Sequence, residues 1–247
     1  MRRRAVGAGS VVAAATGLQR GKTVGRSALK IGAACAVAGS ALMLAGTLLH
    51  PMHADPIDAV AAFTEYALDR YWIASHLMQL AGVVLMVAAL LILTRRAEAT
   101  TDAAWPRLAA GGAIASLAVA TVLQAVDGVA LKAMVDNWAA APASEKAMAF
   151  QAALAVRQVE IGLASTLSIL FGLTISVCGA ALLDDRAYPR WLAVVGILGG
   201  VPAVIAAVVM AYTGFSGLAM VFSMSAGSLL IAWMTAVGVC MWRRPAD

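Results

Sequence analysis

Polar side chains that could bind or transform a ligand occur at the ends of several apolar segments of this chain, at comparable depths. Imidazole and carboxylate groups bind metal ions and move protons, and carboxamides orient small polar ligands. The candidates for a shared polar pocket are His76, Gln79, Gln124, Asp127, Arg157 and Glu160. We expect such a pocket if the fold brings these segments together.

The three histidines of the chain also suggest a metal site. The candidate ligands are His50, His53 and His76, with Asp55, Asp127 or Glu160 as the carboxylate. This set would suit zinc or copper, although its spacing matches no zinc signature and Pro51 interrupts the helix between the first two histidines. A bis-histidine haem is a second interpretation. The third is that the histidines only cap helix ends, so we expect no cofactor and keep metal and haem as alternatives.

The elements that carry these side chains are predicted to be membrane-spanning helices. The 247 residues are 62% hydrophobic and 13% charged, with a mean hydropathy of +0.86, which excludes an ordinary soluble domain. A helix needs about 20 apolar residues to cross a bilayer. Six segments without Asp, Glu, Lys or Arg meet that need: 31–49, 72–94, 108–126, 161–183, 191–212 and 217–242. The sequence therefore predicts an all-α, polytopic transmembrane bundle with six spans.

The distribution of basic residues orients the predicted bundle. Of the 18 lysines and arginines, all but Arg70, Lys132, Lys146 and Arg157 lie in the N-terminal tail or in connections on the same side. The side richer in Lys and Arg is cytoplasmic, so we expect both termini in the cytoplasm and the chain in the inner (plasma) membrane of a bacterium. Contact with the lipid bilayer accounts for the net charge of +5, and no nucleic-acid partner is expected.

The first 27 residues differ in composition from the rest of the chain. They are basic and rich in Gly and Ala, and we expect residues 1–27 to form a disordered tail and residues 28–244 a single transmembrane domain. A signal peptide is the competing interpretation, because Arg2, Arg3 and Arg4 precede a weak apolar run. No convincing cleavage site follows that run, which favours the tail.

Two predicted helices carry small residues at intervals of four. The stripes are Gly32, Ala36 and Ser40 on the first span and Gly112, Ser116 and Ala120 on the third. Small residues let helix backbones approach closely. Packing within one bundle and contact between two copies in a homo-oligomer both explain them.

Two connections on the outer side are long enough to form structure of their own. The run from Asp55 to Asp58 predicts a short helix that is capped by Asp55, ends near Leu68 and turns Phe63 to the membrane. Between the third and fourth spans the helical pattern continues on both sides of Pro142. This pattern predicts a helical hairpin that projects beyond the outer membrane surface.

The hairpin geometry predicts how the buried charges are paired. Asp127 and Arg157 lie at similar distances from the predicted tip, so we expect an ion pair between them. Glu160 lies one turn deeper and has no cation of its own. Burial should then favour its protonated form, because desolvation of a carboxylate is costly.

Several stretches resemble those of a known group of proteins. They are Leu49-His50-Pro51, Trp72-Ile-Ala-Ser-His76, Ala125-Val-Asp127-Gly128, Arg157-Gln-Val-Glu160 and Ala211-Tyr-Thr-Gly-Phe215. In these the chain resembles a group of bacterial six-span inner-membrane proteins to which no activity is assigned. The resemblance covers roughly residues 30–244 and implies the topology but no mechanism.

Three functions remain open at this point. The first is an integral membrane protein whose outward-facing polar pocket binds or conducts a small molecule or ion. The second is a metal- or haem-binding membrane accessory protein, and the third is a non-catalytic envelope assembly or interaction protein. Neither a nucleophile elbow, a zinc-protease motif, a P-loop nor a dinucleotide fingerprint is present, so an enzyme is not our expectation.

Overall fold

A computed structural model describes residues 24–101 and 103–244, which form helices and connections without a β-strand. Six helical segments are long and apolar enough to cross a membrane. They are α2 (Arg26–Leu49), α4 (Trp72–Ala97), the continuous segment Ala104–Ala140, α7 (Lys146–Leu183), α8 (Arg190–Thr213) and α9 (Gly217–Trp242). The predicted six-span helical bundle is confirmed, and the chain has the architecture of a multi-pass membrane protein.

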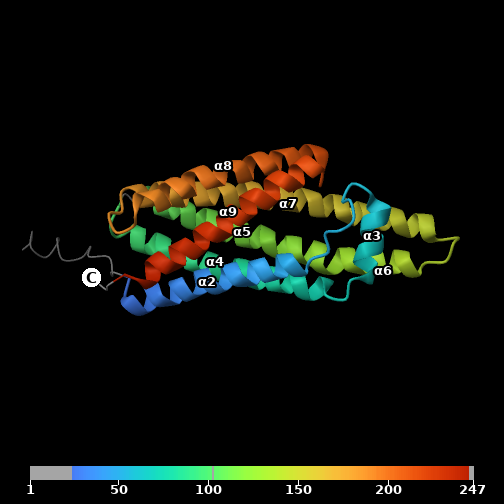
Figure 1. The fold of residues 1–247 in the computed structure, drawn as a ribbon, viewed down its shortest axis with the longest axis horizontal. Helices are drawn as coiled ribbons and strands as arrows, with labels where there is room; N and C mark the ends of the chain where they lie inside the picture. The colour runs from blue at the N-terminus through green and yellow to red at the C-terminus, as the bar shows by residue number, and fades with distance from the viewer. Residues whose placement is uncertain (1–23, 102, 245–247) are drawn as a thin grey trace, which may run out of the picture.

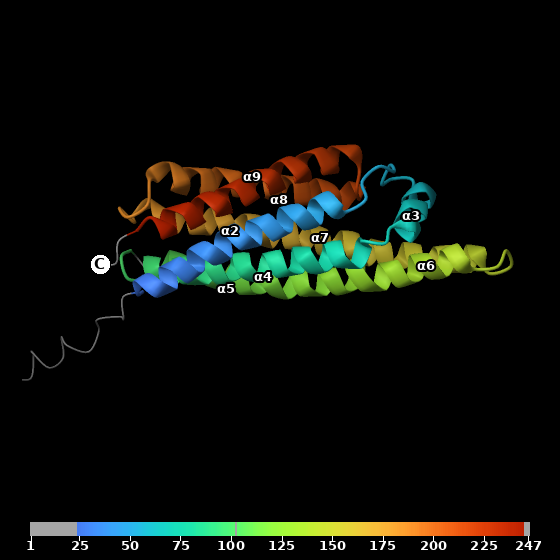
Figure 2. The same cartoon turned by 60° about the horizontal axis from the view of Figure 1, so that its bottom comes forward.

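The spans run along a common long axis (Figure 1). Figures 1 and 2 place the start of α2 and the end of α9 at the same end of the bundle, which we call the terminal end. At the opposite end, the short helix α3 (Ala59–Leu68) lies across the spans. We call this the α3 end. Residues 1–23 of the predicted tail lie outside the described residues, and α2 begins at Arg26, inside the predicted tail.

The third span passes without interruption into the predicted hairpin. α5 (Ala104–Ala125) continues through a π-helical turn, η1 (Val126–Leu131), into α6 (Lys132–Ala140). The chain turns around Pro142, and α7 begins at Lys146. The rings of Trp138 and Phe150 pack across the hairpin with centroids 5.9 Å apart. The hairpin is therefore present, and it projects past α3 (Figure 1).

Two details of α3 differ from the prediction. Its N-cap is Asp58, whose carboxylate accepts two N–H groups of the first turn, whereas Asp55 stabilises the preceding turn. Phe63 is fully buried instead of facing the membrane, with its ring 6.0 Å from that of Trp138 and 5.7 Å from that of Phe150. The reason is that α3 packs on the projecting hairpin, a surface that the sequence pattern of α3 alone does not show.

Small residues bring neighbouring helices of the same chain into contact. A Cβ placed on Gly39 of α2 would lie 2.8 Å from the carbonyl oxygen of Gly82 of α4, and the reverse holds equally. The predicted stripes also face other helices: the Ser40 hydroxyl donates to the carbonyl oxygen of Ile231 on α9, and Ser116 is fully buried. These contacts favour the packing interpretation of the stripes over a contact between copies.

Candidate functional site

The centre of the site is a contact between His76 on α4 and Asp127 on η1. Nε2 of His76 and Oδ2 of Asp127 are 2.9 Å apart, with 2% and 15% of the two side chains exposed. The other ring nitrogen, Nδ1, lies 2.7 Å from the backbone carbonyl oxygen of Trp72. Because a carbonyl oxygen can only accept, Nδ1 carries a proton and donates it there. This hydrogen bond fixes the ring and turns Nε2 toward Asp127.

A π-helical turn and a glycine bring Asp127 to α4. Such turns insert one residue into a helix and occur often at functional sites. A Cβ on Gly128 would lie 2.6 Å from the Cβ of His76, so only glycine permits this approach of η1 to α4. Nε1 of Trp72 donates to the backbone carbonyl oxygen of Asp127 at 3.1 Å. The position of the carboxylate therefore depends on the backbone of η1 as well as on its side chain.

We expect Gly128→Ala to lower the free energy of unfolding by about 1–3 kcal/mol, because the added methyl group would collide with His76. The measurement is reversible unfolding in mixed micelles. Gly111→Ala is the matched control, since a Cβ there would meet nothing within 4 Å and alanine favours a helix. Equal losses in the two variants would show that the close approach at Gly128 is unimportant.

A second polar pair joins the same two helices one turn deeper. Nε2 of Gln124 donates to Oε1 of Gln79 at 3.2 Å. Gln79 follows His76 by about one turn on α4, and Gln124 precedes Asp127 by about one turn. The structure thus brings four of the six predicted pocket residues together as two stacked pairs between α4 and the third span.

The predicted ion pair between Asp127 and Arg157 was wrong. The Arg157 guanidinium is buried, and it donates to the carbonyl oxygen of Pro56 at 2.8 Å and to the hydroxyl oxygen of Tyr66 at 3.5 Å. Three aromatic rings have centroids 5.5 or 5.6 Å from the guanidinium carbon: Phe63, Tyr66 and Phe215. The pairing fails because α3 and its preceding loop supply closer acceptors, while Asp127 contacts α4.

Glu160 is buried on α7, one turn from Arg157, as predicted. Its side chain makes no ion pair within 4.0 Å with any described residue, and its Oε2 atom is buried without a hydrogen-bond partner in the described part of the chain. The charged groups that act on Glu160 electrostatically are Asp127 and Arg157. Glu160 is therefore a buried carboxyl group without a direct partner in the described residues.

Four buried atoms on the spans at the α3 end share one chemical character, and Oδ2 of Asp69, in the turn after α3, is a fifth buried acceptor without a described partner. Each of the four offers a lone pair, and none receives a hydrogen bond from a described residue: His76 Nε2, Gln124 Oε1, Asp127 Oδ1 and Glu160 Oε2. We call them the acceptor cluster. Leaving such atoms unsatisfied costs about 1–3 kcal/mol each, and an unsatisfied group in a native fold calls for an explanation such as a bound ion.

His50 completes a group of three potential metal ligands. Its ring centroid lies 5.0 Å from that of His76 and 4.8 Å from that of Trp72. One ligand atom from each of His50, His76 and Asp127 lies within 4.8 Å of the others. Nδ1 of His50 is 2.9 Å from the carbonyl oxygen of Pro51, so it carries the proton and leaves a lone pair on Nε2.

Burial favours the neutral form of two groups beside the cluster and outside the spans, His50 and Tyr66. Burial lowers the pKa of His50, and the neighbouring His76 lowers it further. Burial raises the pKa of Tyr66, while the Arg157 guanidinium opposes that shift. His50 and Tyr66 therefore add no charge that would repel a cation.

The structure does not bring His53 to the other two histidines. Its side chain is 97% exposed, and its Nδ1 lies 3.1 Å from Glu65 of α3. The same carboxylate accepts the backbone N–H groups of His53 and Ala54 at 3.0 and 2.8 Å. Glu65 thus fixes the loop after α2, and the contacts of His53 are part of that attachment.

The aromatic residues around the site were missed as site residues at the level of sequence. Trp72 is 1% exposed, and its ring centroid lies 4.7 Å from that of His76 and 4.4 Å from that of Tyr66. One signal was available, because Trp72 and His76 are four residues apart and so share a helix face. The position of Tyr66 had no such signal, since it depends on how α3 folds back.

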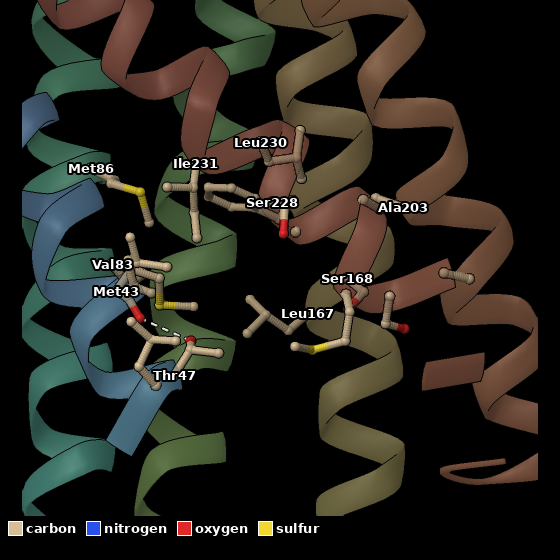
Figure 3. Close-up of a pocket in the computed structure, with 18 of the residues that line it drawn as sticks. Met43, Thr47, Val83, Met86, Leu167, Ser168, Ala203, Ser228, Leu230 and Ile231 are labelled. Atoms are coloured by element: carbon tan, nitrogen blue, oxygen red, sulfur yellow. Dashed lines mark hydrogen bonds between the residues drawn. The ribbon is translucent and has the colours of Figure 1, made fainter. Parts of the chain in front are cut away.

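A separate cavity of about 410 Å³ lies among α2, α4, α7, α8 and α9 (Figure 3). Its walls are mainly apolar side chains such as Met43, Val83 and Leu167, with hydroxyl groups from Thr47 and Ser168. The Thr47 hydroxyl donates to the backbone carbonyl oxygen of Met43 at 2.9 Å. None of the six predicted pocket residues lines this cavity, so it is not the polar pocket that the sequence suggested.

Comparison of the chain with protein-family models, curated proteins and solved structures found no match. The arrangement of side chains at the α3 end is therefore the basis on which a function can be assigned.

Proposed function

We propose that this protein is a multi-pass protein of the bacterial inner membrane that binds a cation at the α3 end of its bundle. The observation that supports the proposal is the acceptor cluster, four buried lone-pair atoms that lack a donor among the described residues. A cation is the kind of ligand that satisfies several lone pairs at once. The carboxylate of Asp127 adds negative charge, which favours the same ligand.

The distribution of basic residues supports an outward-facing site. Arg95, Arg96, Arg186 and Arg190 lie at the terminal end, and the α3 end carries few cations. By the positive-inside rule the terminal end then lies in the cytoplasm. The α3 end, with its cluster, would take its ion from outside the cell membrane.

Binding is better supported than passage through the bundle. Between the cluster and the terminal end, the six spans contain no Asp, Glu, Lys or Arg over most of their length, whereas transport pathways are marked by ionisable groups inside the membrane. The apolar cavity of about 410 Å³ is not lined by residues of the cluster. For a bound haem, and for an envelope-assembly role of the hairpin, the described residues add no observation beyond those made on the sequence.

The test is whether a cation stabilises the purified protein. After chelator treatment, sodium, potassium, magnesium, calcium and zinc are each titrated while the melting temperature in detergent is followed. A ligand that binds only the folded state at about 100 times its Kd stabilises it by about 2.7 kcal/mol, so at least one ion should raise the melting temperature saturably. A melting temperature that none of these ions changes would refute the proposal.

Two variants test whether the cation-induced shift in melting temperature arises from the acceptor cluster. Asp127→Asn should abolish the cation-induced shift, because it removes a carboxylate ligand at constant size. Glu160→Gln should weaken the affinity while leaving the cation-free melting temperature nearly unchanged, because the Glu160 carboxyl has no ion pair to break among the described residues. Asp136→Asn is the control, since that carboxylate is half exposed and pairs with Lys132 on α6. A shift that survives Asp127→Asn would place the ion elsewhere.

A further inference from the structure

We infer that the bound cation is a divalent transition-metal ion of the zinc class, coordinated by the imidazoles of His50 and His76 and the carboxylate of Asp127. This inference rests on the proposed cation site and names the class of its ligand. Its basis is that one ligand atom from each of the three residues lies within 4.8 Å of the others. They come from three different segments, the end of α2, the first turns of α4, and η1.

The chemistry of the three ligands selects the class of metal. Imidazole nitrogen suits zinc, copper, cobalt and nickel, whereas calcium and magnesium take six or more oxygen ligands. Two histidines and one carboxylate form a ligand set found in zinc sites that keep a fourth position open for water or a substrate. His50 and Asp127 are only partly buried, so the open position can be reached from the α3 end.

Both imidazoles are already held in the tautomer that a metal requires. Nδ1 of His76 donates to the carbonyl oxygen of Trp72 at 2.7 Å, and Nδ1 of His50 donates to that of Pro51 at 2.9 Å. Metal-binding histidines usually donate their second ring N–H to a carbonyl or carboxylate in this way, which fixes the orientation of the ring. Each histidine is thereby left with a lone pair on Nε2.

The contact between His76 and Asp127 has the length of a hydrogen bond but not its geometry. Nε2 of His76 and Oδ2 of Asp127 approach to 2.9 Å, yet Nε2 has no hydrogen-bond partner among the described residues because the contact lacks hydrogen-bond geometry. Two ligands of a tetrahedral zinc ion, each about 2.0–2.1 Å from the metal, lie about 3.3–3.4 Å apart. The separation of 2.9 Å between His76 and Asp127 is about 0.4–0.5 Å shorter than that, so a bound ion would move the two groups slightly apart.

The main competing arrangement is an internal ion pair without a metal. A doubly protonated His76 would then neutralise Asp127, and His50 would only stack on Trp72. That arrangement leaves Oδ1 of Asp127 without a donor among the described residues, and it gives the Nε2 atom of His50 no polar role. The two arrangements differ in whether both histidines are needed for metal affinity.

The experiment uses the full chain, purified with a tag that contains no histidine, so that the three natural histidines are the only ones present. The protein is stripped with chelator and titrated with Zn²⁺ by calorimetry, and with Co²⁺ by visible absorption. We expect one metal ion per chain and the strong absorption of a low-symmetry, four-coordinate cobalt site. His50→Gln and His76→Gln should each weaken Zn²⁺ affinity by more than about 100-fold, beyond the effect of losing an outer partner.

His53→Gln is the matched control, because this histidine is 97% exposed and bonds to Glu65 instead. It should leave affinity and spectrum unchanged. If His76→Gln fails to fold, His50→Gln still decides the question, because His50 lies outside the spans and is partly exposed. Binding that survives His50→Gln, or that is lost in His53→Gln, would overturn the assignment.

If only sodium, magnesium or calcium stabilises the protein, the cation site stands and the transition-metal assignment fails. If no cation binds, both fail.

Discussion

Replacing Trp72 by alanine is expected to lower the free energy of unfolding by about 3–5 kcal/mol, the range for removal of a fully buried tryptophan. The side chain is 1% exposed, and its ring centroid lies within 4.4–4.8 Å of those of His50, Tyr66 and His76. Its loss would leave a void between α4 and α3. Reversible unfolding in mixed micelles measures the change, and cation affinity should fall with it.

Two further variants separate the contributions of Trp72. Trp72→Phe keeps most of the ring but removes the N–H that donates to the Asp127 carbonyl oxygen, so it should cost about 0.5–1.5 kcal/mol plus a packing loss. Trp105→Ala is the control for removing a tryptophan, because that side chain is 49% exposed at the start of α5. If Trp72→Ala is no more destabilising than Trp105→Ala, Trp72 does not hold the site together.

Arg157→Met is expected to lower the free energy of unfolding by about 2–4 kcal/mol. The change removes a charged donor from the carbonyl oxygen of Pro56, worth about 1.5–3 kcal/mol, and a cation that faces three aromatic rings, worth about 0.5–2 kcal/mol. Methionine keeps much of the side-chain volume, so the loss reports mainly on the guanidinium. Hydrogen exchange should show faster opening of the Pro56 loop and of α3, with little change in α8.

Arg157→Lys tests whether charge alone suffices. A lysine keeps the positive charge but lacks the planar guanidinium that donates in two directions and stacks on rings, so we expect most of the loss to remain. Arg70→Met is the control at the same end, because Arg70 is exposed and its guanidinium carbon lies 4.7 Å from the centroid of the Tyr71 ring. Full recovery in Arg157→Lys would mean that Arg157 acts only through its charge.

The architecture was predictable from the sequence because it depends on local composition. Each span is a long apolar segment, and a bilayer has no water to satisfy backbone groups, so such a segment must be helical. The helical pattern on both sides of Pro142 likewise predicted the hairpin. The depth of Glu160 predicted that it is buried without an ion pair, because no Lys or Arg other than Arg157 lies near that depth.

The partners of the polar side chains were less predictable, because they depend on backbone contacts between segments. Asp127 was expected to pair with Arg157 on the basis of equal depth, yet a π-helical turn and Gly128 bring it within 2.9 Å of His76. Arg157 instead bonds to the loop before α3. Depth along a span follows from residue counting, whereas the direction in which a side chain points depends on one inserted residue.

The sequence by itself therefore determined that this chain is a six-span helical bundle and that its polar residues gather at one end. Only the tertiary structure decided that His50, rather than His53, lies beside His76 and Asp127. The physical reason is that hydrophobic burial sets the depth of each segment in the membrane, whereas α3 folding back over the bundle sets which groups meet. That fold depends on the packing of Phe63 and Tyr66 against α6 and α7, which no local pattern encodes.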